Sequence, residues 1–162
     1  MLSQLFTRFD KKCVENEVYK VHTIGDCYVV LGYSGISLRD PLRECLNVVK
    51  MARDMVEIIK DENLIHGSDL NMRIGIHTGD VIGGVIGTNT VRYDIWGPDV
   101  LIANKMESSG QPGFINVSED TRRLLLQNYD ENFSFCMNSE VIIESLRRSV
   151  RCFFLETKNK TC

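Results

Sequence analysis

The sequence lacks any run of the roughly 20 apolar residues that a membrane span requires, and no signal peptide opens it. We therefore expect no membrane contact by this part of the protein. The expected location is the cytoplasm, and any membrane anchor would belong to another part of a parent protein. There is also no internal repeat, low-complexity tract or linker, so 162 residues predict one domain over 1–162.

An excess of positive charge is also missing. The net charge is −3 and the isoelectric point is near 5.6. Basic residues gather only in the short pairs Arg122-Arg123 and Arg147-Arg148, which are typical of solvated faces. A nucleic-acid-binding domain usually carries a basic patch. The composition therefore argues against a nucleic-acid partner.

The six cysteines form no CxxC pair and have no zinc-ligand spacing. Cys27 and Cys45 lie within apolar runs, where a free cysteine acts as a small hydrophobic side chain. The pattern predicts reduced thiols throughout, as in a cytosolic protein.

Hydrophobic periodicity predicts helices and strands in an α+β arrangement. Gly25-Asp26 is expected to be the tight turn of a hairpin. Asp40-Pro41 is expected to start a helix that closes in the polar stretch 60–69, and Ser118 to cap another. A second strand pair is expected around Thr78-Gly79-Asp80. The expected elements are a helix at 2–15, strands at 18–24 and 27–31, a helix from 41, strands at 71–77, 81–86 and 93–96, a helix at 100–107, a strand at 114–117, a helix at 118–127, and a hairpin of 140–144 with 150–155.

Asp26 is the first candidate for chemistry. A carboxylate at the tip of a tight turn projects beyond the strands, where a divalent cation can meet it. Mg²⁺ is usually held by one or two carboxylates together with substrate phosphates. The alternative is that aspartate and glycine occur here only because turns favour them. Taken alone, the turn favours that alternative.

A glycine-rich stretch over 75–87 is the second candidate. It does not match the phosphate loop of nucleotide triphosphatases, and it is more typical of strands. Glycines in strands allow another backbone or a ligand to approach closely. His77 within this stretch is interpreted as a satisfied core histidine rather than a base, His22 as a strand residue beside Asp26, and His66 as a loop residue without a specific role.

A third candidate is Asp94, which lies between aromatic and apolar neighbours on a short strand. A half-buried carboxylate there can accept a hydrogen bond from the amino group of a nucleobase. It can also be an ordinary polar group at the end of a strand.

Five segments together resemble the class III adenylyl and guanylyl cyclases, in the family's order and spacing. The first resembles the hairpin that carries the family's second metal-binding aspartate, and the second its central strand motif. They are Val18-Tyr-Lys-Val-His-Thr-Ile-Gly-Asp-Cys-Tyr28, Met72-Arg-Ile-Gly-Ile-His-Thr-Gly79, Arg92-Tyr-Asp-Ile-Trp-Gly97, Ala103-Asn-Lys-Met-Glu-Ser-Ser-Gly110 and Ile115-Asn-Val-Ser118. The resemblance covers nearly the whole chain, from Leu2 to Leu155.

The resemblance implies a ferredoxin-like α+β core, with a mostly antiparallel sheet and helices packed on it, that works as a dimer. Two Mg²⁺ or Mn²⁺ ions help the ribose 3′-hydroxyl of a purine nucleoside triphosphate attack the α-phosphorus and release pyrophosphate. Asp26 matches the second of two metal-binding aspartates and is the expected catalytic residue, and Gly25 beside it is expected to bind the nucleotide. The first belongs to an Asp-Ile-x-Gly-Phe-Thr-type motif that should precede Leu2. The resemblance therefore implies a missing first strand and helix, and a chain that is inactive alone.

The other half of such a dimer normally supplies an Asn and an Arg. On the resemblance these positions hold Leu101 and Lys105. The chain is thus expected to be the metal-bearing half, paired with a complementary half. Arg147 lies near a phosphate-contacting position and is interpreted as a solvated turn residue.

The resemblance places His22 and Asp94 at the base-reading positions. They match neither the family's adenine-reading pair nor its guanine-reading pair. Similarity to protist guanylyl cyclases with unlike halves favours GTP over ATP. The alternatives are an adenylyl cyclase, or a non-catalytic pseudocyclase that supports a partner half.

Overall fold

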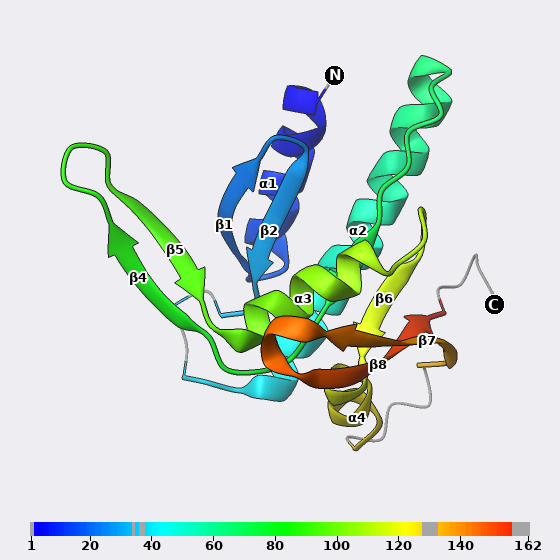
Figure 1. Cartoon of the computed structure of the whole chain (residues 1–162). Coiled ribbons are helices and arrows are strands. Elements are labelled where there is room, and N and C mark those ends of the chain that lie inside the picture. Colours follow the sequence, from blue (N-terminus) through cyan, green and yellow to red (C-terminus); the bar gives the residue numbers. More distant parts are fainter. Residues whose placement is uncertain (1, 34, 36–37, 128–132, 157–162) are drawn as a thin grey trace.

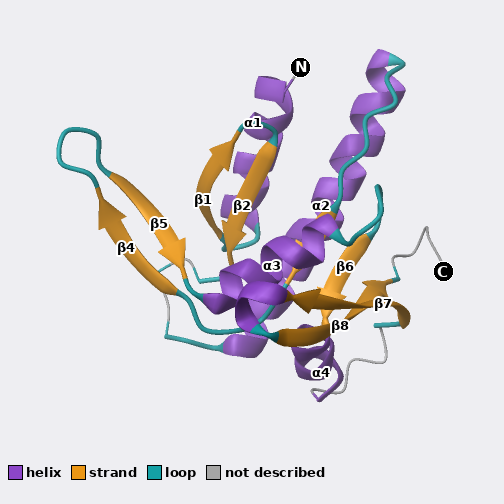
Figure 2. Ribbon diagram, in the orientation of Figure 1, coloured by secondary structure: helices purple, strands orange, loops and turns teal. Residues whose placement is uncertain are grey.

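The computed structural model describes residues 2–33, 35, 38–127 and 133–156. Three groups of strands lie around helices, as Figures 1 and 2 show. The elements are α1 (Leu2–Glu15), β1 (Tyr19–Ile24), β2 (Cys27–Leu31), α2 (Pro41–His66), β3 (Ile74–Ile76), β4 (Ile82–Ile86), β5 (Arg92–Trp96), α3 (Pro98–Ser108), β6 (Ile115–Ser118), α4 (Glu119–Gln127), β7 (Phe135–Ile143), the 3-10 turn η1 (Glu144–Leu146) and β8 (Arg148–Leu155).

The centre of the fold is a four-stranded sheet in the order β3-β6-β8-β7. β3 runs parallel to β6, and the other neighbours are antiparallel. One face packs with α1, α2 and α4 in the main core, which includes Phe9, Val49 and Val117. α3 packs on the opposite face, where Ile102 and Met106 are fully buried. The expected α+β architecture with a mostly antiparallel sheet is confirmed.

The long helix α2 starts as the sequence predicts and ends at His66, within the polar stretch 60–69 where it was predicted to close. The Asp40 side chain accepts a hydrogen bond from the backbone nitrogen of Arg43 at 3.1 Å, and Pro41 occupies the first turn. The polar stretch after Lys60 remains helical because Glu62 is buried against α1. Gly67, with φ 60°, ends the helix in the left-handed conformation that glycine tolerates.

The predicted pairing of 71–77 with 81–86 is wrong. β3 pairs instead with β6, and β4 pairs with β5 over five residue pairs from Ile82↔Trp96 to Ile86↔Arg92. After β3 the chain leaves the sheet and forms a separate two-stranded ribbon (Figure 1). The two ends of this ribbon are joined by a hydrogen bond from the backbone nitrogen of Asp80 to the carboxylate of Asp99, at 2.7 Å.

The β1–β2 hairpin forms at the predicted position, with Gly25 at φ 61° in its turn. It is a separate two-stranded unit that lies beside α1 (Figure 1). The C-terminal hairpin also forms, but β7 begins at Phe135, earlier than predicted. Ser118 caps α4 as predicted, because its hydroxyl accepts a hydrogen bond from the backbone nitrogen of Thr121.

The expectation of reduced thiols throughout is wrong at Cys136, which is disulfide-bonded. Spacing along a chain does not show which cysteines the fold brings together. Cys13, Cys27, Cys45 and Cys152 are free. None of the helices in the described ranges is long and apolar enough to cross a membrane.

Candidate functional site

Asp26 lies at the tip of the β1–β2 hairpin, exposed to solvent. Within the described part of the chain, its carboxylate has neither a hydrogen bond nor an ion pair. The neighbouring Cys27 thiol has a raised pKa, first because it is partly buried and then because the carboxylates of Glu107 and Asp26 are near. Carboxylates of both the turn and α3 therefore lie near the tip of the hairpin.

A free carboxylate in such a place fits one ligand of a divalent cation. No cluster of three or more acidic, histidine or cysteine side chains suited to a metal occurs among the described residues. The donors are therefore too few for a cation held by protein alone. They do suit Mg²⁺ or Mn²⁺ whose remaining ligands are water and substrate phosphates.

His22 and Asp94 lie side by side, although they are far apart in the sequence. Nδ1 of His22 is 3.3 Å from Oδ1 of Asp94, and both side chains are mostly buried. The distance is that of an ion pair, but this buried nitrogen makes no hydrogen bond. The fold thus brings the two predicted base-reading residues together.

Groups of the chain itself already engage both oxygens of Asp94. Oδ1 accepts a hydrogen bond from the backbone nitrogen of Ile95 at 2.9 Å, and Oδ2 lies 3.2 Å from Arg92. The carboxylate is consequently less available to a ligand than the sequence suggested. The unpartnered ring nitrogen belongs to His22.

His77 is a satisfied core histidine, as interpreted from the sequence. Only 2% of its side chain is exposed. Its Nδ1 lies 2.7 Å from the hydroxyl of Ser118, and its Nε2 lies 3.2 Å from the carboxylate of Asp99. These contacts join the end of β3 to the first turn of α3 and to the end of β6, where Ser118 caps α4, and they leave no free nitrogen for base catalysis.

Leu101 and Lys105 lie on α3 and line a hollow of about 550 Å³ together with Ile142–Ser145. Leu101 is 44% exposed, so an apolar surface occupies the place where the resemblance calls for an asparagine. Arg147 lies outside this lining; it is exposed in the turn before β8, with φ 46°, as expected of a solvated turn residue.

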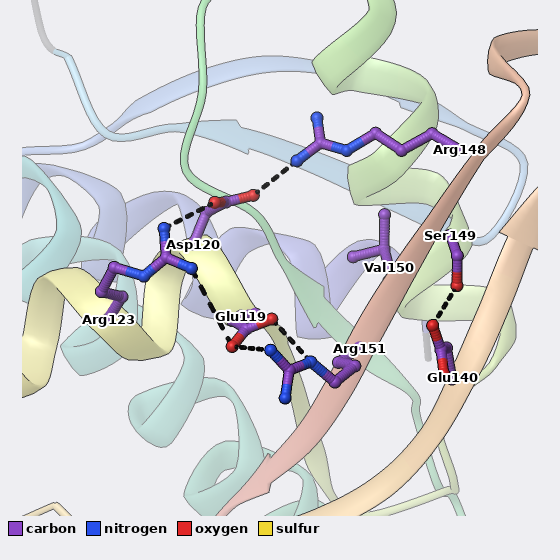
Figure 3. A pocket seen from close by; sticks show the side chains of 8 residues that line it. All are labelled: Glu119, Asp120, Arg123, Glu140, Arg148, Ser149, Val150 and Arg151. Atoms are coloured by element: carbon purple, nitrogen blue, oxygen red, sulfur yellow. Dashed lines mark hydrogen bonds and ion pairs between the residues drawn. The ribbon is translucent and has the colours of Figure 1, made fainter.

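A second hollow, of about 350 Å³, lies between α4 and the β7–β8 hairpin (Figure 3). Its charges are paired within the chain. Arg151 contacts Glu119 at 2.6 and 2.8 Å, and Arg148 contacts Asp120 at 3.2 Å. Neither hollow is lined by His22, Asp26 or Asp94. With its arginines neutralised, the second hollow has no free charge to attract an anion.

Sequence reasoning missed a group on the opposite side of the hairpin. Asp10 of α1 accepts hydrogen bonds from Lys20 and Tyr28, which lie on β1 and β2. The signal was weak, because Asp10 sits on the polar face of α1, where an acid needs no special explanation. Only the folded hairpin shows that the three residues meet.

Comparison with known proteins gives a consistent result. The sequence model described as "Adenylate and Guanylate cyclase catalytic domain" matches residues 1–157. Guanylate cyclase alpha of Plasmodium falciparum is 40% identical over 164 residues, which cover 99% of this chain and 4% of that protein. Guanylate cyclase soluble subunit alpha-1 of Rattus norvegicus is 45% identical over 125 residues, or 77% of this chain and 18% of that protein. The chain thus spans a small part of the length of these relatives.

Solved structures agree. The guanylate cyclase domain of RhGC from Catenaria anguillulae, in complex with GTP, has a TM-score of 0.81 at 26% identity, covering 96% of this chain and 81% of that one. The adenylyl cyclase CyaB from P. aeruginosa has a TM-score of 0.82 at 19% identity, covering 98% and 82%, which speaks for the fold alone. With the family match extending over nearly every residue, the chain belongs to the adenylate and guanylate cyclase catalytic domain family.

Proposed function

We propose that this chain, as a single catalytic domain over 1–162, is the metal-bearing half of a purine nucleotide cyclase. In the proposed reaction GTP becomes 3′,5′-cyclic GMP and pyrophosphate. The ribose 3′-hydroxyl attacks the α-phosphorus, the bond from that phosphorus to the bridging oxygen breaks, and the hydroxyl proton leaves to solvent. When bound, Mg²⁺ or Mn²⁺ would stabilise the negative charge that develops on the phosphate oxygens.

The observation that carries this proposal is the free carboxylate of Asp26 at the exposed tip of the hairpin. Aspartates that merely satisfy a turn often hydrogen-bond the backbone two residues on. Asp26 has no such bond. A carboxylate with no structural task supports a role as a ligand.

A complementary half is part of the proposal, because this chain has Leu101 and Lys105 on the face of α3 where a partner half would carry Asn and Arg. A leucine side chain offers no hydrogen bond to a transition state. The exposed apolar side chains of the β4–β5 ribbon support such a partner. Ile82 is 70% exposed, Val85 66% and Val91 61%. One of the structural neighbours is described as a non-canonical dimeric guanylyl cyclase domain.

GTP is proposed over ATP because the relatives from Plasmodium falciparum are named guanylate cyclases and RhGC was solved with GTP. Nδ1 of His22 is buried and lies 3.3 Å from Asp94, so this nitrogen faces the carboxylate of its own chain rather than a bound base. The engagement of Asp94 by Arg92 supports the division of labour in which the complementary half reads the base. On this proposal, the cytoplasmic location follows from the substrate.

The first test compares the full-length protein with its Asp26→Asn variant. Cyclic GMP and cyclic AMP are measured from GTP and ATP with Mn²⁺, in the presence of the complementary half. We expect cyclic GMP from the wild type and a loss of at least about 100-fold in the variant, because an amide is a poor ligand for a hard cation. Asp69→Asn, at an exposed loop after α2, is the matched control and should keep activity.

Full activity in Asp26→Asn would contradict the metal role. The second candidate function is a pseudocyclase that only supports a partner, and it is favoured by the lack, among the described residues, of a cluster of three or more side chains suited to a metal. Assembly with the partner half but no product from either nucleotide, even in the wild type, would establish that alternative.

A further inference from the structure

The β1–β2 hairpin carries Asp26, and side-chain contacts rather than strand pairing join it to the main sheet of the described structure. It is a two-stranded unit with no strand of the four-stranded sheet beside it in the described structure. Isolated two-stranded hairpins are marginally stable in water. The position of the Asp26 carboxylate therefore depends on what fixes the hairpin to the rest of the domain.

One face of the hairpin is fixed by three polar residues that meet at a single oxygen, and we call Asp10, Lys20 and Tyr28 the hairpin clamp. Oδ1 of Asp10, on α1, accepts hydrogen bonds from the Tyr28 hydroxyl at 2.5 Å and from Lys20 Nζ at 2.7 Å. Burial alone would raise the pKa of Asp10, but the hydrogen bonds from Lys20 and Tyr28 outweigh burial and lower it. A charged acceptor makes these bonds stronger than neutral ones.

Tyr28 also makes aromatic, cation–π and sulfur contacts with its neighbours. Its ring lies 5.4 Å from the rings of Phe6 and Phe9 on α1, and Lys20 Nζ lies 5.1 Å from its centre. Its hydroxyl also lies 3.3 Å from the sulfur of Cys13.

A β-bulge in β1 lies between Lys20, which belongs to the clamp, and His22, which lies beside Asp94. In the ladder, Lys20 faces Val30 and His22 faces Val29, so Val21 is an extra residue on β1. In a regular strand Lys20 and His22 would share a face. The bulge instead turns Lys20 toward Asp10 and His22 toward Asp94. One strand thus reaches both the clamp and the predicted base-reading pair.

We propose that Asp10, Lys20 and Tyr28 are positioning residues that hold the Gly25-Asp26 turn where its carboxylate meets a divalent cation. The inference rests on the proposed function, because it assigns the clamp a role only if Asp26 binds metal. Tyr28 lies two residues from Asp26, at the start of β2. A displacement of the Tyr28 side chain after loss of its hydrogen bond to Asp10 would therefore also displace the turn.

The test is Tyr28→Phe in the full-length protein with its complementary half, because phenylalanine keeps the ring among Phe6 and Phe9 and removes only the hydroxyl. Bound Mn²⁺ is measured by electron paramagnetic resonance in the presence of GTP, and product formation is measured across Mn²⁺ concentrations. We expect the apparent Mn²⁺ dissociation constant to rise about 3- to 10-fold, below the loss for a partner bonded directly to a metal ligand. Activity at saturating Mn²⁺ should recover most of the wild-type kcat.

Lys20→Gln is the second variant and should shift the same constant in the same direction. Tyr19→Phe, on β1 but outside the clamp, is the control and should shift nothing. If the clamp served folding alone, Tyr28→Phe would reduce folded protein and lower activity equally at every Mn²⁺ concentration; that outcome overturns the inference. If Asp26→Asn loses metal binding but Tyr28→Phe keeps the wild-type Mn²⁺ dependence, the role of the clamp is overturned and the proposed function stands. If Asp26→Asn binds Mn²⁺ as the wild type does, the proposed function itself is overturned.

Discussion

Single residues set how closely the elements of this domain approach each other, and Gly75 is the clearest case. It lies in β3 on the face covered by α3. A Cβ added there would lie 2.1 Å from the backbone nitrogen of Glu107 and 2.6 Å from the carbonyl carbon of Met106. Both contacts are with backbone, which cannot rotate away as a side chain can. The absence of a side chain at Gly75 thus sets the distance between β3 and α3.

We expect Gly75→Ala to reduce the free energy of unfolding by about 2–3 kcal/mol, at the upper end of overpacking costs, because α3 must move as a whole. Gly84→Ala is the matched control. Its added Cβ would lie 3.4 Å from the Trp96 ring, an ordinary contact, so stability should stay within about 0.5 kcal/mol of wild type. Urea unfolding of both variants measures the difference. Equal stability would mean that α3 adjusts to the added methyl group.

At this scale the sequence predicted the local structure or environment of some residues correctly. Gly25-Asp26 forms the predicted turn, and His77 is buried and hydrogen-bonded as interpreted. Arg92 lies two residues from Asp94 on the same strand, so the pattern allows that contact, but His22 reaches Asp94 only after β1 lies alongside β5 and was not predictable. The metal and base roles of Asp26, His22 and Asp94 stay predictions.

At the scale of elements, ion pairs of very different burial join the helices and strands. Arg8 of α1 reaches α2, where it contacts Glu62 at 2.7 Å and Asp61 at 2.9 Å. Only 7% of the Glu62 side chain is exposed. Between α4 and β8, by contrast, Arg151 is 51% exposed and Glu119 22% (Figure 3). The Coulomb energy of a pair falls as water screens it, so these similar distances carry different energies.

We expect Arg8→Met to lower the free energy of unfolding by about 1–3 kcal/mol, because it leaves the buried Glu62 with His66 as its remaining partner, at 3.4 Å. The matched control Arg151→Met should cost about 0–1 kcal/mol, as exposed pairs do. Thermal unfolding at low and high salt separates the two, since salt weakens only the exposed pair appreciably. A larger loss from Arg151→Met than from Arg8→Met would contradict this order.

Element positions were easier to predict than their pairing. Periodicity placed α1, β1, β2 and α3 within a few residues, since each pattern is local. The partner of β3 was wrong because short apolar strands do not encode which edge they join. The hydrogen bond from Asp80 to Asp99, which joins the two ends of the β4–β5 ribbon, likewise links residues 19 positions apart.

At the scale of the whole molecule, the β1–β2 hairpin lies beside α1, whereas the β4–β5 ribbon extends away from the four-stranded sheet and its helices (Figure 2). The β4–β5 ribbon projects farthest and exposes Ile82, Val85 and Val91. A two-stranded ribbon with apolar side chains in water gains stability when a second surface covers it. This property fits a domain that works with a complementary half.

We expect Val85→Lys to weaken association with the complementary half by about 10- to 30-fold, because a lysine charge in an apolar interface loses its hydration and gains no partner there. The fold itself should be unaffected, since Val85 is 66% exposed in the single chain. Leu64→Lys is the matched control: Leu64 is 84% exposed near the end of α2, away from the ribbon, and its substitution should leave association unchanged. Sedimentation of the mixed halves measures the affinity, and cyclic nucleotide formation at low protein concentration should fall in parallel. If Val85→Lys assembles as tightly as the wild type, the complementary half lies elsewhere on the domain; if both variants weaken association equally, the effect is one of net charge and not of the ribbon.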